Sequence, residues 1–401
     1  MSGTPRLPSL AVIGGGIFGL TAALEAAQLK VAVSVFERSA NTLQGASKIN
    51  TGVVHLGYHY PRSMETVLQS QRGSGPFTER FSDCILSNFP KYYCVASKAS
   101  LTSAEAYLAF CEQHHLPYRL EYPPDPFLDR ENVHLSIRVS EGIFDYRALR
   151  ARLLEELSLH RHVSLLTQHE VVGASVLNHG EQRKKLQVLS NGSVTEQEFD
   201  FVLNASYANT NFINSLFGAE PLNLQYEVSE FVVLSIPWQD GPLAVTVMDG
   251  PFCTINPFGF TGLYSLGHVE TTIRKRSIGH APAFDCQETP LNHCRMESNR
   301  RLVGDCNLCP AKPSTIFPEM VRKSQVFFPI LSQARHERSY FVMRCVLAHH
   351  EFDDARPTLV LNVGPGIWSI LGGKLDTSLD AAQEFRASLE ARLASTIPCP
   401  Q

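Results

Sequence analysis

The hydrophobic pattern of the first forty residues alternates between strand-like and helix-like segments. Residues 9–13 (SLAVI) are a short apolar run that leads into three glycines, residues 17–28 carry Ala and Leu at helical spacing, and residues 31–37 (VAVSVFE) are rich in β-branched residues. Strand, glycine turn, helix and strand within about 30 residues are typical of the βαβ unit of parallel sheets. We therefore predict an α/β fold with a parallel sheet that starts at the N-terminus.

Further elements follow along the chain. Thr102 and Glu105 have capping-box spacing and predict a helix over 106–115, and residues 146–158 (YRALRARLLEELS) have one apolar helical stripe. From residue 162 the pattern becomes strand-like, and the dipeptide Asn191-Gly192 predicts a hairpin turn.

The second half of the chain contains a β-rich block and a different ending. Residues 221–345 contain several β-rich runs, and the chain closes with a strand over 358–363, a Gly-Pro-Gly turn and a helix over 374–395. We therefore predict a Rossmann-like domain, built from N- and C-terminal segments, with an inserted β-rich substrate domain. The expected segments of the nucleotide-binding domain are 1–80, 141–220 and 346–401, and those of the substrate domain are 81–140 and 221–345.

Composition and charge narrow the class of protein. The chain has 401 residues, 44% of them hydrophobic and 18% charged, with 35 Lys and Arg against 39 Asp and Glu. This composition is that of a globular protein, and the formal charge of −4 without a long basic run argues against nucleic-acid binding. Neither a secretory signal nor an apolar run of membrane-spanning length is visible, so we expect a cytoplasmic protein with reduced cysteines.

A dinucleotide-binding fingerprint occupies the first βαβ unit. Gly14-x-Gly16-x-x-Gly19 follows the strand and opens the helix, and Glu37 ends the next strand 18 residues later. Gly14 permits the tight turn, Gly16 lets a pyrophosphate approach the helix N-terminus, and Gly19 permits close helix packing. Glu37 can accept hydrogen bonds from ribose hydroxyls and disfavours a 2′-phosphate. The fingerprint predicts FAD or NAD and argues against NADP; the alternative is glycines that serve only packing.

Two sequence segments resemble a known family. The N-terminal unit followed by residues 45–60 (GASKINTGVVHLGYHY) resembles the FAD-dependent oxidoreductases of the D-amino-acid oxidase superfamily, and residues 366–382 (GIWSILGGKLDTSLDAA) are similar to the closing motif of glycerol-3-phosphate dehydrogenases. The resemblance implies that FAD is the cofactor and that residues 45–57 run beside the flavin. A helix N-terminus after Gly372-Gly373-Lys374 could face the flavin pyrimidine, where negative charge appears on reduction. The implied cofactor contacts are Gly14, Gly16, Ile17, Phe18, Gly19, Glu37, Arg38, Ala46, Ser47, Asn50, Thr51, Gly52, Val171, Ala205, Gly372, Gly373 and Lys374.

Candidates for the chemistry lie next to the segment that resembles the flavin-proximal strand. The pattern Asn50-x-Gly52-x-x-His55-x-Gly57 is similar to that of 2-hydroxyglutarate dehydrogenases, which makes His55 the first candidate for the proton acceptor and His59 the second. The alternative is a histidine packed against tyrosine in a polar core. We therefore expect oxidation of a CH–OH donor, such as a 2-hydroxy acid, with oxidation of an amino acid or other amine as the alternative. A non-catalytic flavin-fold binding protein is the third reading.

Several residues could bind the charged end of a small-molecule substrate. Arg344 lies where the family often places an arginine that clamps a carboxylate or phosphate, although an ion pair with Asp353 or Asp354 is an equal alternative. Arg62 and Arg274 are further candidates, and Tyr264 and His268 could line the pocket. The electron acceptor, whether oxygen, a quinone or a protein, is left open by the sequence.

Four cysteines lie in a polar segment with several prolines, 276–313. Cys306-x-x-Cys309 has the spacing of a zinc knuckle, but Cys286 and Cys294 do not complete a pair of such motifs. We therefore predict no metal site and expect an insertion or lid-like loop.

Overall fold

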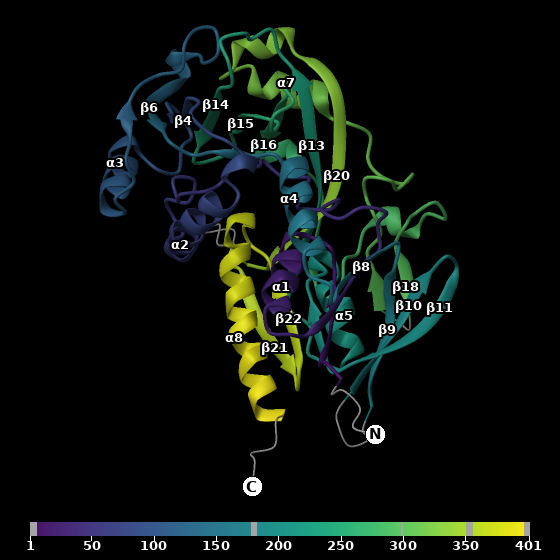
Figure 1. The fold of residues 1–401 in the computed structure, drawn as a ribbon. Coiled ribbons are helices and arrows are strands. Elements are labelled where there is room, and N and C mark those ends of the chain that lie inside the picture. Colours follow the sequence, from purple (N-terminus) through teal and green to yellow (C-terminus); the bar gives the residue numbers. More distant parts are fainter. Residues whose placement is uncertain (1–5, 178–182, 298–299, 350–355, 397–401) are drawn as a thin grey trace, which may run out of the picture.

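Two large sheets organise the molecule (Figure 1). The computed structural model describes residues 6–177, 183–297, 300–349 and 356–396. The first sheet has six strands and is mostly parallel, and the second has nine strands and is mostly antiparallel. In Figure 1 the six-stranded sheet lies below with α1 (Ile17–Ala27) and α8 (Ser378–Thr396), and the nine-stranded sheet lies above.

The six-stranded sheet joins both ends of the chain. β1 (Ser9–Ile13) pairs in parallel with β2 (Ala32–Glu37) on one side and β12 (Phe201–Asn204) on the other, and β12 pairs in parallel with β22 (Ile367–Leu371). β22 lies near the C-terminus, so the first and last parts of the chain share one sheet, as the sequence predicted. In spatial order its strands are β21 (Leu359–Gly364), β22 (Ile367–Leu371), β12 (Phe201–Asn204), β1 (Ser9–Ile13), β2 (Ala32–Glu37) and β8 (Val163–Thr167).

Helices pack on one face of this sheet. α1 (Ile17–Ala27) lies between α8 (Ser378–Thr396) and the strands, and its alanines Ala22, Ala23 and Ala26 are fully buried. Small side chains let two helices and a sheet approach closely, which explains the Ala-rich sequence of α1. α4 (Tyr146–Ser158) adds its Leu stripe to the same core.

α5 (Thr210–Leu216) follows β12 and contacts a separate three-stranded sheet, which consists of β9 (Glu170–Leu177), β10 (Arg183–Ser190) and β11 (Ser193–Phe199).

The nine-stranded sheet is built around the long strand β13 (Leu224–Ser235). β20 (Arg335–Leu347) pairs antiparallel with β13 along its whole length, and β17 (Ile273–Gly279) and β16 (Tyr264–His268) share its other edge. The remaining strands are β15 (Cys253–Pro257), β14 (Ala244–Met248), β4 (Lys91–Ala96), β6 (Val133–Val139) and β5 (Arg119–Leu120). The smaller elements are β3 (Ile85–Leu86), β7 (Ile143–Phe144), β18 (Arg295–Glu297), β19 (Arg300–Leu302), α2 (Met64–Arg80), α3 (Ala104–Gln113), α6 (Val269–Thr272) and α7 (Phe317–Ser324).

The predicted α/β fold, with its Rossmann-like part and β-rich part, is confirmed, and so are the helix over 146–158 and the Asn191-Gly192 turn. Two details are wrong. Ser103, not Thr102, caps α3, because the Ser103 hydroxyl accepts the Ala106 N–H (3.1 Å) whereas Thr102 donates to Asp249. The segment 276–313, expected as a loop, also contains the hairpin β18–β19. Exact domain boundaries stay a prediction. None of the described helices has the length and apolarity needed to cross a membrane.

Candidate active site

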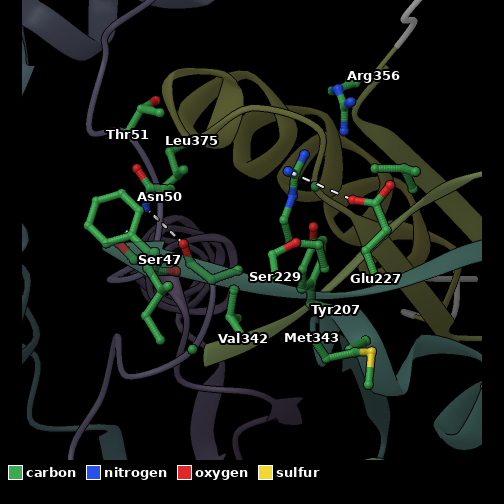
Figure 2. Close-up of a pocket in the computed structure, with 18 of the residues that line it drawn as sticks. Ser47, Asn50, Thr51, Tyr207, Glu227, Ser229, Val342, Met343, Arg356 and Leu375 are labelled. Atoms are coloured by element: carbon green, nitrogen blue, oxygen red, sulfur yellow. Dashed lines mark hydrogen bonds and ion pairs between the residues drawn. The ribbon is translucent and has the colours of Figure 1, made fainter. Parts of the chain in front are cut away.

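A cavity of about 810 Å³ extends between the two sheets. Its wall begins at the glycine turn after β1, follows residues 44–60, and reaches the cavity-facing side of β13 and β20 and the segment Gly372–Leu375. Figure 2 shows Ser47 and Asn50 on one side of this space and Glu227 on the other. The cavity therefore joins the dinucleotide-binding fingerprint to the β-rich part of the molecule.

The glycine turn has the geometry that the fingerprint predicts. Gly14 has φ +113°, and a Cβ there would lie 2.5 Å from the Ala205 carbonyl oxygen. A Cβ on Gly19 would lie 1.9 Å from the Gly14 carbonyl oxygen, so helix and turn touch through their backbones. A Cβ on Gly16, in contrast, would meet only the Ser47 hydroxyl at 3.3 Å and otherwise enter the cavity. The N-terminus of α1 thus faces open space of the kind that a pyrophosphate requires.

Glu37 is fixed at the end of β2 on the cavity wall. One carboxylate oxygen accepts the Gly15 N–H (2.8 Å) and the other accepts the Ser39 N–H (2.7 Å). Each carboxylate oxygen has a second lone pair, so Glu37 can still accept a ribose hydroxyl. Arg38, beside it, donates to the Val303 carbonyl and lies 3.9 Å from Glu170.

Hydrogen bonds of small polar side chains hold the segment that follows β2. The Ser47 hydroxyl accepts the Ile17 N–H (3.1 Å), and the Asn50 side chain bonds the carbonyls of Ala46 and Ser47 and the N–H of Gly52. These hydrogen bonds fix the backbone of the segment, which forms part of the cavity wall.

Most residues with predicted cofactor contacts lie on the cavity wall, and two do not. Gly19 packs against the Gly14 turn, and Gly52, with φ +71°, packs against β7, so both shape the wall from behind. The remaining predicted residues line the cavity: Gly14, Gly16, Ile17, Phe18, Glu37, Arg38, Ala46, Ser47, Asn50, Thr51, Val171, Ala205, Gly372, Gly373 and Lys374. The glycine cradle, the helix N-terminus at the cavity and the acidic strand end together fit an adenine dinucleotide.

His55 is a buried histidine on the cavity wall. Its Nδ1 makes no hydrogen bond within the described residues, and its backbone N–H donates to Asp376 Oδ2 (2.7 Å). Burial, reinforced by the positive charge of Lys374, lowers the pKa of His55 well below its usual value. The lowered pKa favours the neutral ring, and a neutral imidazole nitrogen can accept a proton.

A buried ion pair supports the residue next to His55. The Glu141 carboxylate accepts the Leu56 N–H (2.7 Å) and the Tyr93 hydroxyl (2.7 Å), and it lies 2.8 Å from Lys91 Nζ. Both charged side chains are fully buried, and such a pair is retained only with good geometry and additional hydrogen bonds. Glu141 and Asp376 thus hold the backbone at His55 and Leu56 from two sides.

His59 and Lys374 complete this part of the wall. The His59 ring lies 5.8 Å from the His55 ring and 5.0 Å from the Tyr60 ring, and Lys374 Nζ lies 4.0 Å from the Tyr60 ring centroid. Burial lowers the pKa of Lys374 and raises that of Asp376. Lys374 follows Gly372 and Gly373 and precedes α8, so the closing segment brings a cation next to the two histidines.

The three candidate arginines have different surroundings. Arg344 of β20 lines the cavity. Its Nη1 lies 3.7 Å from the Glu227 carboxylate, so Glu227 is the ion-pair partner of this arginine within the described residues. Asp353 and Asp354, the partners that the sequence offered, lie outside the described residues. Arg62 also lines the cavity and makes two hydrogen bonds to Asp249 (2.8 and 3.0 Å).

Arg274 and Tyr264 do not belong to the cavity wall, whereas His268 does. Arg274 pairs with the buried Glu230 (2.6 Å). Tyr264 is wrong as a pocket residue because its ring packs in the core beside Phe127. The His268 Nδ1 accepts the N–H of Glu270.

The four cysteines of the 276–313 segment are free thiols. Among the described residues no group of three or more His, Cys, Asp and Glu has the arrangement of a metal site. Cys294 accepts the Gly304 N–H (3.5 Å), and Cys306 lies on the cavity wall. Val303 in the same segment bonds the Asn209 side chain through both its N–H and its carbonyl. The segment therefore covers the end of the cavity near Arg38.

No sequence pattern pointed to several residues of the cavity wall and of its support. Glu141 accepts a backbone N–H from a residue 85 positions away, and Asp376 accepts one from a residue 321 positions away. Gln225, Glu227 and Ser229 look like ordinary strand positions in the sequence. Alternation along residues 224–230 could have assigned them to one face, but not that this face lines a cavity.

Comparisons with known proteins agree with this geometry. The family model of the FAD-dependent oxidoreductases (DAO) matches residues 9–373. A curated FAD-dependent monooxygenase, FPY4 of Fusarium mangiferae, is 27% identical over 273 residues, which are 66% of this chain and 64% of that protein. The chain thus spans less than two thirds of that relative's length.

Solved structures with the same fold cover almost the whole chain. L-α-glycerophosphate oxidase of Mycoplasma pneumoniae with FAD bound has a TM-score of 0.70 at 15% identity, covering 96% of this chain and 95% of that one. Glycine oxidase of Geobacillus kaustophilus has a TM-score of 0.65 at 15% identity, covering 98% and 96%. The family match across residues 9–373, together with the glycine cradle, assigns the cofactor as FAD. The chain therefore belongs to the DAO family of FAD-dependent oxidoreductases.

Proposed function

We propose that this oxidoreductase removes a hydride from the CH–OH group of a small, polar, anionic substrate of the 2-hydroxy-acid type. The observation that carries the proposal is His55, a buried histidine of the cavity wall whose Nδ1 has no hydrogen-bond partner within the described residues, and whose pKa is lowered by burial. A CH–OH donor must lose a hydroxyl proton together with its hydride, and a neutral imidazole is suited to accept that proton. FAD, when bound, supplies the hydride acceptor.

Other wall residues would orient the substrate. Arg344 presents a planar guanidinium whose donors suit a carboxylate or phosphate, and its 3.7 Å separation from Glu227 is longer than a hydrogen bond, so these donors can turn to an anion. Asp376 and Glu141 act as positioning residues, because each accepts a backbone N–H at or next to His55. His59 is the second candidate for the proton acceptor.

The alternative is oxidation of a CH–NH group in an amino acid or other amine. Glycine oxidase and L-proline dehydrogenase of P. horikoshii (TM-score 0.67, 16% identity, covering 98% of this chain and 96% of that one) have the same fold. Fold likeness at this identity does not choose between the donors. A protonated amine would need to lose its proton before hydride transfer, and His55 could accept that proton as well.

The first experiment compares the two donor classes on the purified, FAD-loaded protein. Anaerobic mixing with 2-hydroxy acids should bleach the flavin absorbance faster than mixing with the matched amino acids. His55→Ala should stay yellow but reduce its flavin at least about 100-fold more slowly, which is typical of a lost general base. His134→Ala, on the exposed face of β6, is the matched control and should reduce at the normal rate.

Two results would contradict the proposal. Faster bleaching by amino acids than by hydroxy acids would assign the alternative donor. Normal reduction by the His55→Ala variant would remove His55 from the reaction, and His59→Ala would then be tested in the same way.

A further inference from the structure

One side of β13 presents a row of hydrogen-bond acceptors to the cavity. Side chains alternate along a strand, so Tyr226 and Val228 pack in the core while Gln225, Glu227 and Ser229 line the cavity. Gln225 Oε1, Glu227 Oε2 and Ser229 Oγ are buried and have no hydrogen-bond partner within the described residues. Glu227 Oε2 has its ion pair with Arg344, whose Nη1 lies 3.7 Å away, beyond hydrogen-bond distance. Asn256 Oδ1 on β15 is also buried without a hydrogen-bond partner within the described residues, and Asn256 lines the same cavity. We call these four side chains the acceptor row.

The hydrogen bonds that these side chains make inside the protein do not use the acceptor atoms named above. The Gln225 amide nitrogen donates to Glu227 Oε1 (2.7 Å), and the Asn256 amide nitrogen donates to the Thr254 hydroxyl (3.1 Å). Each amide therefore uses one of its N–H groups inside the protein, and its carbonyl oxygen has no partner within the described residues. A buried acceptor without a donor is unfavourable, so the row is completed by a ligand or water that brings several O–H or N–H groups.

The charges around the row favour hydroxyl groups over an ammonium group. In the register of the sheet, Glu227 lies opposite Arg344 of β20 on one side and opposite Arg276 of β17 on the other. Both arginines line the cavity. Two cations beside one carboxylate disfavour a third cation, whereas neutral hydroxyls can donate to the acceptors and accept from the guanidinium groups.

The spacing of the row sets a minimum size for the ligand. Alternate residues of a strand lie about 7 Å apart, so Gln225, Glu227 and Ser229 extend well beyond a two- or three-carbon acid. A chain of about six carbon atoms is needed to reach two neighbouring members of the row.

We propose that the acceptor row binds the hydroxyl groups of a polyhydroxylated acid whose chain has about six carbons, while the arginines bind its anionic end. This inference rests on the proposed function, because it assigns the class of CH–OH donor that the same cavity accepts. In the reaction the donor carbon loses a hydride to FAD and its hydroxyl loses a proton to His55, which leaves a carbonyl group.

The test compares donors that differ only in the tail. Six-carbon aldonic acids of several configurations, including D-gluconate, are compared with 2-hydroxyhexanoate, which lacks the tail hydroxyls, and with 6-amino-2-hydroxyhexanoate, which carries an ammonium tail. The FAD-loaded protein should be reduced by at least one aldonic acid with an efficiency about tenfold or more above that of 2-hydroxyhexanoate. Binding is measured separately, as the change in flavin absorbance or thermal midpoint at saturating acid.

Variants of the row connect this preference to its residues. Gln225→Met and Ser229→Ala should each lower the ratio of aldonic-acid efficiency to 2-hydroxyhexanoate efficiency by about three- to tenfold, the effect of one lost neutral hydrogen bond. Ser235→Ala, on the same strand but off the cavity wall, is the matched control and should keep the ratio. An unchanged ratio in both variants would overturn the inference, and so would equal use of the three tails or a preference for the ammonium tail.

The failure of this inference differs from the failure of the proposed function. If 2-hydroxy acids bleach the flavin without any tail preference, the function stands and the row has another role. If only amino acids bleach it, the proposed function fails, and the row is tested with D-glucosaminate against norleucine. Those two acids differ by the same tail hydroxyls, so the absence of a preference between them would also overturn the assignment of the row.

Discussion

At the scale of single residues, the site depends on groups whose partners are far away in sequence. The N–H groups of His55 and Leu56 are accepted by Asp376 and Glu141, and Glu141 is paired with the buried Lys91. The sequence predicted a proton acceptor at His55 from its local pattern, but the two carboxylates that fix its backbone carry no pattern of their own. Only the folded chain brings these charges to one place.

Lys374 provides a test of the charge environment of His55. Burial is the main cause of the lowered pKa of His55, and the cations Lys374 and Lys91, together with His59, add to it. The proposed function makes His55 the base, which must then be neutral, so the rate of flavin reduction should fall on acidification only below the usual histidine range. Replacing Lys374 by Gln removes a positive charge and should raise the pKa of His55, which moves this acid limb to higher pH.

The measurement is the pH dependence of anaerobic flavin reduction, recorded for each variant at saturating donor. Lys374→Arg keeps the charge and serves as the control, so its acid limb should stay closer to that of the parent protein. An acid limb that does not move in Lys374→Gln, in a protein that still binds FAD, would mean that another group controls the profile.

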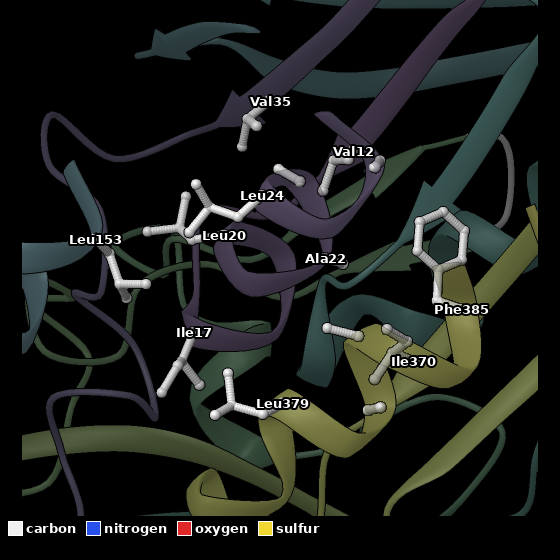
Figure 3. Packing of buried hydrophobic residues seen from close by; sticks show 14 of the residues in the cluster. Val12, Ile17, Leu20, Ala22, Leu24, Val35, Leu153, Ile370, Leu379 and Phe385 are labelled. Carbon is white, nitrogen blue, oxygen red and sulfur yellow. The ribbon is translucent and has the colours of Figure 1, made fainter. Parts of the chain in front are cut away.

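At the scale of elements, the βαβ unit separates two roles of glycine. Gly19 lets α1 touch the turn at Gly14, whereas Gly16 leaves room in front of the helix N-terminus. The Ala-rich face of α1 continues this close packing: Figure 3 shows Ile17 of α1 near Leu379 of α8, in the core that both helices share.

Substitution of these glycines should therefore have different effects. Gly16→Val should fold with a near-normal circular dichroism spectrum but retain little FAD, because its side chain fills the pyrophosphate space. Gly19→Ala should lower the thermal midpoint itself, since its Cβ would lie 1.9 Å from a backbone oxygen. Gly75→Ala in α2, where a Cβ meets nothing within 4 Å, is the control and should change neither property appreciably. Full FAD content in Gly16→Val would refute the placement of the pyrophosphate.

The elements also show where local sequence patterns fail. The helix α2 has no counterpart among the predicted elements, because Gly73, Gly75 and Pro76 interrupt a mostly polar segment. Its Gly73 packs against the backbone of Asp376 and Thr377, next to the segment that supports His55. Close packing of two backbones, rather than helix propensity, explains the glycine at position 73.

At the scale of the whole molecule, the cavity is built by all parts of the chain. Residues near both termini and residues of the nine-stranded sheet share one wall. A ligand that binds only the folded state stabilises it by mass action, which amounts to about 2.7 kcal/mol at 100 times its dissociation constant. Removal of FAD should therefore lower the thermal midpoint of the whole chain.

The measurement is the unfolding temperature of the protein before and after FAD is stripped and then restored. Added FAD should recover the original midpoint, whereas NADP should not, because Glu37 at the end of β2 disfavours a 2′-phosphate. A midpoint that is insensitive to FAD would contradict the assignment of the cavity to this cofactor.

The sequence by itself determined the βαβ unit, the glycine fingerprint, the FAD cofactor and the joining of both chain ends in one domain. These features are local: turn sterics, helical spacing and strand alternation act over a few residues, and a family resemblance can be read from short motifs. The tertiary structure alone decided that Asp376 and Glu141 support His55, that Arg344 faces Glu227, and that one side of β13 lines the cavity. These contacts join residues far apart in the chain, and their energies depend on burial, which no local pattern encodes.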